Sequence, residues 1–282
     1  MVYNKTVNIW TNTGKQTIEV TGTDREVNRL LVGDATEILQ QEFHESTFDL
    51  TVTSPPYEDL RNYNGFSFDA EKMLEAIYRV TKSGGVCVWV VGDRIKVERS
   101  LVSFKHALIA REVGFQIHDV MIYQKKNTPF MRANSYTNCY EFMFVFSKGK
   151  PKTFNPLMTP TVRNGWEKGV TNKGPDAVNR KVPIKLKKEK VKTNIWSYAV
   201  GLGGSTSDRF AFEHPAIFPE QLAADHILSW TNRGDIVLDP MCGSGTSCKM
   251  AKMHGRNFVG IDISADYIEI SKRRLKEIGE RV

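Results

Sequence analysis

Two short loops, each placed directly after an apolar run, constrain the fold of this chain most strongly. The first is Thr53-Ser54-Pro55-Pro56-Tyr57, which follows the apolar run 48–52. The second is the glycine-rich segment 239–246 (DPMCGSGT), which follows the apolar run 236–238. Short apolar runs bounded by turn residues are typical of buried strands, and α/β sheets bind ligands at the carboxyl ends of their strands. We therefore expect both loops to open onto one cleft.

Predicted strands and helices alternate along most of the chain. This alternation predicts an α/β fold with a doubly wound, mostly parallel sheet. Apolar runs predict strands at 30–32, 48–52, 86–91, 115–123, 140–146, 236–238 and 258–261, and helical spacing predicts helices at 35–43, 70–80, 101–112, 219–230, 246–253 and 265–278. The stretch 148–204 shows no sustained period and is predicted to be a largely irregular insertion. The first 28 residues are predicted to form a hairpin extension.

The chain therefore divides into an extension (1–28), a half that carries the Ser-Pro-Pro-Tyr loop (29–147), the insertion (148–204) and a half that carries the glycine-rich loop (205–282). At 282 residues it is long enough to bury a core, and no apolar run approaches the length of a membrane span. Its four cysteines and six histidines show no metal-ligand spacing, so we expect no metal, reduced thiols and a cytoplasmic location.

Positive charge is concentrated in one segment. Residues 148–192 contain 13 Lys or Arg and three acidic residues, whereas the rest of the chain has 26 Lys or Arg and 29 acidic residues. With Trp166, Trp196 and Tyr198 interleaved or adjacent, this segment fits contact with nucleic-acid phosphates and bases. A solvated lysine-rich face is the alternative interpretation for 185–192.

The glycine-rich loop indicates a ligand that approaches the backbone, because side chains at Gly243 and Gly245 would block it. Cys248 stands where a dinucleotide fingerprint has its third glycine, which argues against NAD. Asp262 ends the next predicted strand, where a carboxylate can accept hydrogen bonds from ribose hydroxyls. A cap for the last helix is the alternative role of Asp262.

Together the two loops resemble those of S-adenosylmethionine-dependent DNA amino-methyltransferases, and their order resembles the beta group, in which the catalytic loop precedes the cofactor loop. The resemblance implies a Rossmann-like methyltransferase sheet with circularly permuted motifs and S-adenosylmethionine as the cofactor. It implies cofactor contacts at Asp239, Pro240, Cys242, Gly243, Ser244, Gly245, Thr246, Asp262 and Ile263.

Two further segments carry the same resemblance. His214–Glu220 is similar to the segment that lines the methionine end of the cofactor, with Phe218 and Pro219 as the expected contacts and His214 beside them. Gly33-Asp34 resembles the loop near the adenine, although Asp34 is equally placed to cap a helix. Met241 stands where family members commonly have Phe, and it can fill the same apolar space.

The catalytic prediction follows from the chemistry of an exocyclic amine, whose lone pair is delocalised into the base. Ser54 and the carbonyl of Pro55 can each accept one N–H and direct the lone pair at a methyl donor, while the prolines Pro55 and Pro56 fix the loop. The target nucleotide must be flipped out of the duplex, and Tyr57 can stack on it. Taken alone, this tetrapeptide could also be a rigid exit from a strand.

Substrate selection is predicted to lie in two places. The basic insertion is the candidate target-recognition region, and 123–141 resembles the family region beside the base pocket, with Lys126, Asn127 and Pro129 as candidate contacts. Within the family, Ser-Pro-Pro-Tyr favours N4-cytosine and Asp-Pro-Pro-Tyr favours N6-adenine. We therefore expect a site-specific cytosine-N4 methyltransferase of duplex DNA, with adenine-N6 methylation as the alternative. A structured-RNA enzyme, an inactive DNA-binding subunit and a homodimer also remain open.

Overall fold

An eight-stranded sheet forms the centre of the computed structural model, which describes residues 2–11, 14–23, 27–56, 68–95, 98–127, 133–161, 167–173, 175–176, 178–185 and 187–280. The strands lie in the order β12-β6-β7-β5-β4-β13-β14-β3, and only β7 runs antiparallel to the others. Their bounds are β3 Arg29–Val32, β4 Phe48–Thr53, β5 Thr81–Val91, β6 Gln116–Lys125, β7 Tyr140–Ser147, β12 Ile195–Tyr198, β13 Ile236–Asp239 and β14 Asn257–Asp262. The predicted doubly wound, mostly parallel sheet is confirmed.

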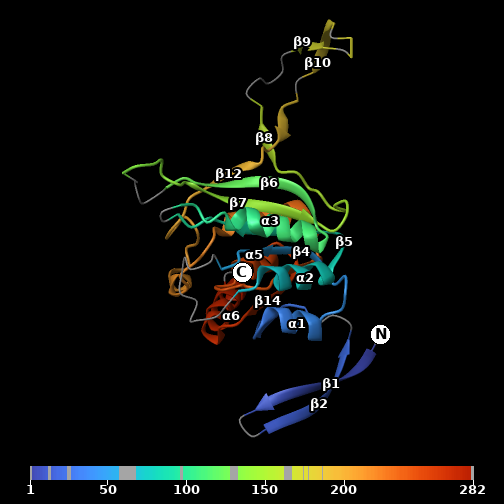
Figure 1. Ribbon diagram of the computed structural model, residues 1–282, viewed down its shortest axis with the longest axis vertical. Coiled ribbons are helices and arrows are strands. Elements are labelled where there is room, and N and C mark those ends of the chain that lie inside the picture. The colour runs from blue at the N-terminus through green and yellow to red at the C-terminus, as the bar shows by residue number, and fades with distance from the viewer. Residues whose placement is uncertain are drawn as a thin grey trace.

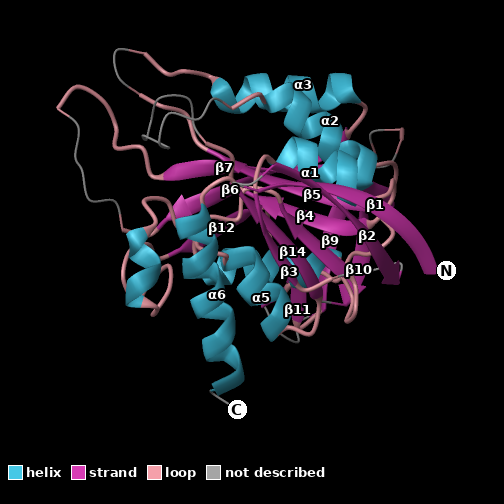
Figure 2. Cartoon of the chain, turned by 90° about the horizontal axis from the view of Figure 1, so that it is seen from below, coloured by secondary structure: helices cyan, strands magenta, loops and turns pink. Residues whose placement is uncertain are grey.

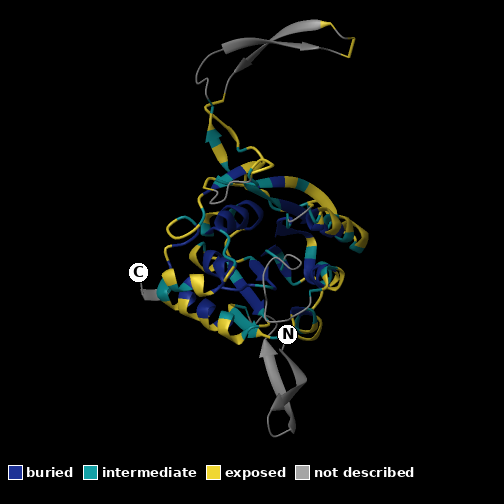
Figure 3. Ribbon diagram, turned by 60° about the vertical axis from the view of Figure 1, so that its left-hand side comes forward, coloured by how far each residue is buried: buried dark blue, intermediate teal, exposed yellow. Residues whose placement is uncertain are grey.

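Helices cover both faces of the sheet (Figure 2). On one face lie α1 Ala35–Glu42, α2 Ala70–Val80 and α3 Val102–Val113, and on the other α4 Glu220–Trp230, α5 Thr246–Met253 and α6 Ala265–Glu280. The second half of β5, residues 86–91, is continuously apolar because both of its faces are covered. Val86, Val88 and Val90 pack on the second set of helices, while Cys87, Trp89 and Val91 pack on the first. The core therefore has two layers, one on each side of the sheet (Figure 3).

Local signals in the sequence explain where the helices start. Asp69 caps α2 by accepting hydrogen bonds from the amides of Glu71 and Lys72, and the buried residues of α2 recur at helical spacing. Asp34 caps α1 in the same way through the amides of Thr36 and Glu37. Most predicted elements agree with the observed bounds to within one or two residues, although β5 begins at Thr81 instead of residue 86.

The insertion is more regular than its sequence indicates. β8 Met158–Pro160 pairs with β11 Glu189–Val191, and β9 Glu167–Lys173 pairs with β10 Asn179–Lys185. These four strands form an arm that projects from the body of the molecule (Figure 1). The expectation of a largely irregular segment was therefore incomplete. The strands β8 and β11 are mostly exposed, and antiparallel pairing of exposed strands needs no apolar pattern in the sequence.

The end of the insertion belongs to the central sheet. Ile195–Tyr198 pairs in parallel with β6 as the edge strand β12, and Trp196 and Tyr198 are only 5% and 6% exposed. The prediction that these two aromatic residues stack on nucleic acid was therefore wrong, and Trp166 lies outside the described residues. At the opposite end of the molecule, β1 Val2–Thr11 and β2 Gly14–Thr23 form the predicted hairpin (Figure 1).

Candidate active site

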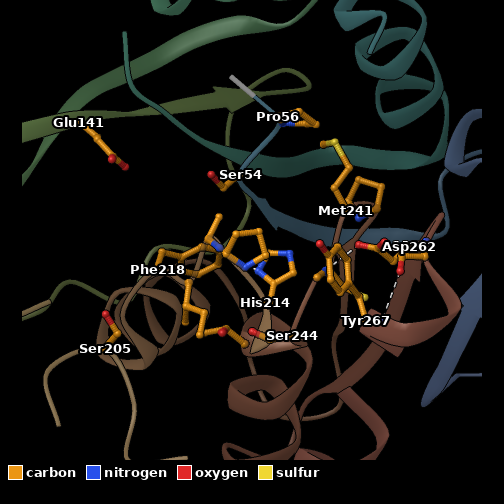
Figure 4. Close-up of a pocket in the computed structure, with 18 of the residues that line it drawn as sticks. Ser54, Pro56, Glu141, Ser205, His214, Phe218, Met241, Ser244, Asp262 and Tyr267 are labelled. Carbon is orange, nitrogen blue, oxygen red and sulfur yellow. Dashed lines mark hydrogen bonds between the residues drawn. The ribbon is translucent and has the colours of Figure 1, made fainter. Parts of the chain in front are cut away.

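A cavity of about 580 Å³ opens at the carboxyl ends of the parallel strands. Its walls come from the loops after β3, β4 and β13, the end of β14, the segment 212–218 and the ends of β6 and β7 (Figure 4). Of the site residues predicted from the sequence, those that line it are Asp34, Ser54, Pro56, His214, Phe218, Pro240, Cys242, Gly243, Ser244, Thr246, Asp262 and Ile263. The two loops thus converge on one space.

The remaining predicted residues do not face this cavity. Pro55, Asp239 and Gly245 are buried and are not among its lining residues, and Pro219 is the buried N-cap of α4. Tyr57 lies outside the described residues. Within the tetrapeptide, Ser54 and Pro56 therefore face the cavity, and Pro55 is not among its lining residues.

Hydrogen bonds fasten the glycine-rich loop to the strand beside it. The Cys242 amide donates to the Ile261 carbonyl at 2.9 Å, and the Gly243 amide donates to the Asp262 carboxylate at 2.8 Å. The second oxygen of Asp262 accepts from the Ser264 amide at 2.9 Å. Burial raises the pKa of Asp262 above its ordinary value. Asp262 thus orders the turn before α6 and also lines the cavity, so both roles considered for it are compatible.

The two glycines are required by the protein itself and not only by a ligand. Gly243 and Gly245 have φ of 48° and 76°, in the left-handed region. A Cβ at Gly243 would lie 2.6 Å from the His214 ring, and a Cβ at Gly245 would lie 2.6 Å from the hydroxyl of Ser271. The packing of His214 and Ser271 thus restricts these positions in addition to any approach of a ligand, and these two contacts could not be seen from local sequence.

A buried network of charged side chains supports the glycine-rich loop. Arg274 is fully buried and donates to the Ser244 carbonyl and to the Thr246 hydroxyl, both at 2.9 Å. Its guanidinium also pairs with Asp208 at 2.9 Å and Glu220 at 2.5 Å, and Lys249 pairs with the same two carboxylates at 2.6 Å. The two cations lower the pKa of Asp208 against the opposing effect of burial, which is the largest single influence. Four charges thus fix one loop, and the sequence carried no signal for them.

The catalytic loop is joined to the cofactor loop by buried hydrogen bonds. The Thr53 hydroxyl donates to the Asp239 carboxylate at 2.8 Å, and the Ser247 hydroxyl of α5 donates to the Val52 carbonyl at 2.9 Å. Complete burial raises the pKa of Asp239 to about 6, against the effect of these hydrogen bonds. Asp239 therefore holds the strands β4 and β13 in register beneath the cavity, and its side chain does not face the ligand space.

Aromatic and apolar side chains form much of the cavity wall. The rings of His214 and Tyr267 meet edge to face with centroids 4.3 Å apart, and Nδ1 of His214 accepts from the Ala216 amide. Phe218 and Met241 line the same space (Figure 4). Sequence reasoning missed Tyr267, because a tyrosine in the first turn of a helix has no distinguishing pattern.

A family model described as DNA methylase matches residues 48–273, which includes both loops. The chain belongs to the N6/N4 DNA methyltransferase family. It is 49% identical over 246 residues to the orphan methyltransferase M.BamHII of Bacillus amyloliquefaciens, with 84% of this chain and 92% of that protein covered. The type II methyltransferase M.HinfI of Haemophilus influenzae is 27% identical, with 89% and 69% covered.

Solved structures share the fold of this methyltransferase. A candidate DNA modification methylase of Thermus thermophilus, complexed with S-adenosyl-L-methionine, has a TM-score of 0.59 at 23% identity, covering 89% of this chain and 95% of that one. The PvuII DNA methyltransferase, described as cytosine-N4-specific, has a TM-score of 0.63 at 19% identity, with 89% of both chains covered.

S-adenosylmethionine is the cofactor of this methyltransferase, and the cavity fits it. The cavity is lined by the glycine-rich loop, by the carboxylate of Asp262 and by the apolar side chains of Phe218, Met241 and Ile263, a set of the kind that a ligand with ribose hydroxyls and apolar parts requires. Asp34 caps α1 and also borders the cavity, so its two predicted roles are compatible. Among the described residues, no group of three or more potential ligands could hold a metal ion, and no helix is long and apolar enough to cross a membrane.

Neither of the two described residues predicted as contacts in 123–141, Lys126 and Asn127, lines the cavity. The side chain of Asn127 makes two hydrogen bonds with the backbone of Val200. Its Nδ2 donates to the Val200 carbonyl at 2.9 Å, and its Oδ1 accepts from the Val200 amide at 2.8 Å. Lys126 is exposed outside the cavity, and Pro129 lies beyond the described residues. Instead, Tyr123, Lys125 and Glu141 line the cavity. Alternation along β6 and β7 could have indicated them, since residues two apart share a face of a strand.

Proposed function

We propose that this protein is a site-specific DNA methyltransferase that transfers a methyl group to the exocyclic N4 amine of a flipped cytosine in duplex DNA. The observation that carries the proposal is the position of Ser54, a hydroxyl-bearing residue at the end of β4 that lines the same cavity as the cofactor loop. A hydroxyl at this position, in place of a carboxylate, favours cytosine over adenine by the resemblance of the tetrapeptide.

The residues of the chain supply orientation. When bound, S-adenosylmethionine supplies an electrophilic methyl group. The hydroxyl of Ser54 accepts one N–H of the base amine, which localises the lone pair and aligns it for displacement. The buried hydrogen bonds of Thr53 and Ser247 hold Ser54 at a constant position relative to the cofactor loop. Pro56 borders the cavity and restricts the loop.

The insertion supports the choice of duplex DNA. Residues 148–192 carry 13 Lys or Arg and three acidic residues, and Lys187, Lys188 and Lys190 are exposed at the base of the projecting arm. A positively charged arm fits contacts with the phosphates of duplex DNA. DNA affinity should therefore fall steeply as salt is raised.

The direct test incubates the purified protein with labelled S-adenosylmethionine and duplex DNA of mixed sequence, followed by digestion to nucleosides and identification by mass. N4-methylcytosine is the expected product. Detection of N6-methyladenine would leave the mechanism unchanged and identify adenine as the target base. Cofactor binding without label in DNA would overturn the proposal, and a parallel incubation with structured RNA would then identify an RNA substrate.

A further inference from the structure

The cavity extends beyond the residues expected to hold the cofactor. A second lobe is lined by Tyr123, Lys125, Thr137, Asn138 and Glu141, which belong to β6, β7 and the segment between them. The glycine-rich loop and Asp262 line the first lobe, and Ser54 lies between the two (Figure 4). The second lobe is thus placed to receive the group that Ser54 presents to the cofactor.

An ion pair is the main polar feature of this lobe. Nζ of Lys125 lies 2.6 Å from Oε1 of Glu141, and the two side chains are 27% and 15% exposed. The ammonium group of Lys125 also lies over the ring of Tyr123, with Nζ 5.8 Å from the ring centroid. Burial, with the nearby Glu141 charge as a smaller cause, raises the pKa of Tyr123, so its phenol stays neutral.

The pair is not needed to join the two strands. β6 and β7 already pair along their backbones from Gln116 to Gln124, and the Lys125 amide donates to the Cys139 carbonyl at 2.7 Å. Removing two charges from water is costly, and apolar residues of similar size hold strands together at least as well. A partly buried ion pair that faces a cavity is therefore better explained by what enters the cavity.

Figure 4 shows the Glu141 carboxylate pointing into the cavity toward Ser54 from the opposite wall. A base whose amine lies at Ser54 must direct its neighbouring ring atoms along this wall. In cytosine the ring atom beside the amine on the Watson–Crick edge is the acceptor N3, and the acceptor O2 follows on the same edge, whereas thymine has a donor at N3 and no amine. An ammonium carries three donors, so Lys125 can hold Glu141 and a base acceptor at once.

We propose that Lys125 is a specificity-determining residue that donates to the acceptors next to the amine of the flipped base, and that Glu141 positions its ammonium group. This inference rests on the proposed function.

The experiment measures binding of two duplexes in the presence of S-adenosylhomocysteine. Both carry the site at which the wild-type protein methylates mixed-sequence DNA, and one has an abasic nucleotide at the target position. Lys125→Met should weaken binding of the intact duplex by roughly 10-fold or more and leave the abasic duplex within about twofold, because the lost hydrogen bond is to the base. Glu141→Gln should show the same selectivity with a smaller loss.

Lys126→Met is the matched control, because this neighbouring lysine is exposed outside the cavity. As a backbone contact, it should weaken both duplexes equally. Equal loss on both duplexes for Lys125→Met, or no loss on either, would overturn the assignment, and Glu141→Gln decides the matter if Lys125→Met fails to fold. Absence of any methylated nucleoside with the wild-type protein would instead overturn the proposed function.

Discussion

The hydroxyl of Thr53 donates a 2.8 Å hydrogen bond to the carboxylate of Asp239, although the two residues are 186 positions apart in the chain. Thr53 immediately precedes Ser54, and Asp239 is the first residue of the glycine-rich loop. This one bond therefore couples the loop that presents the amine to the loop that holds the cofactor. Both partners are buried, so no water competes for it.

Replacement of Thr53 by Val should lower the free energy of unfolding by about 1–3 kcal/mol, because a buried carboxylate loses a donor. Turnover should fall as well, since Ser54 loses its fixed position. Thr51→Val is the matched control, because the Thr51 hydroxyl is buried on the same strand and has no hydrogen-bond partner among the described residues. Urea unfolding should show little change or a gain for Thr51→Val, and equal losses would contradict the coupling.

Replacement of Arg274 by Lys should weaken S-adenosylmethionine binding by roughly 10-fold or more. A lysine retains the charge but cannot reach Ser244, Thr246, Asp208 and Glu220 at once, as the forked guanidinium does. Isothermal titration measures the affinity. Arg273→Lys serves as the control, because its side chain is 57% exposed and its ion pair at 3.9 Å contributes little. If Arg274→Lys binds S-adenosylmethionine with unchanged affinity, Arg274 does not position the glycine-rich loop for the cofactor.

The raised pKa of Asp239 predicts that the free energy of unfolding depends on pH. Its folded-state pKa of about 6 lies above the ordinary 3.8, so its contribution to stability is complete below pH 3.8 and is lost as pH rises through 6. Asp239→Asn does not titrate. The wild-type free energy of unfolding minus that of the variant should thus decrease between about pH 4 and pH 7, by up to about 3 kcal/mol. Denaturant unfolding at both pH values tests this, and a constant difference would mean that burial does not raise this pKa.

Ser54→Ala should keep S-adenosylmethionine binding within about twofold and lower kcat by roughly 10²–10³, because it removes an acceptor for the amine. Single-turnover methylation of duplex DNA separates the chemical step from product release. Ser197→Ala is a suitable control, since Ser197 lies on the edge strand β12 and its hydroxyl donates to Gln124, away from the cavity. Undiminished turnover in Ser54→Ala would exclude the proposed role of the hydroxyl.

Much of this architecture was predictable from local sequence. Helix α2 begins after its cap Asp69 and has buried positions at helical spacing. Residues 86–91 of β5 form a continuous apolar run because helices cover both faces of the sheet. The loops at 53–57 and 239–246 follow buried strands, so their convergence could be predicted from the geometry of a parallel sheet. These features depend on residues that are close together in the chain, so they can be recognised from the sequence alone.

Tertiary structure alone decided how the site is supported. Arg274 reaches the glycine-rich loop from the last helix, His214 requires a glycine at 243, and Lys125 meets Glu141 across two strands. Trp196 and Tyr198 lie in the core even though their neighbours are basic. Each of these contacts joins residues brought together by folding, and a contact of this kind leaves no periodic pattern in the chain. The sequence alone determined the fold class and the two reactive loops, while long-range packing decided which side chains face the cavity.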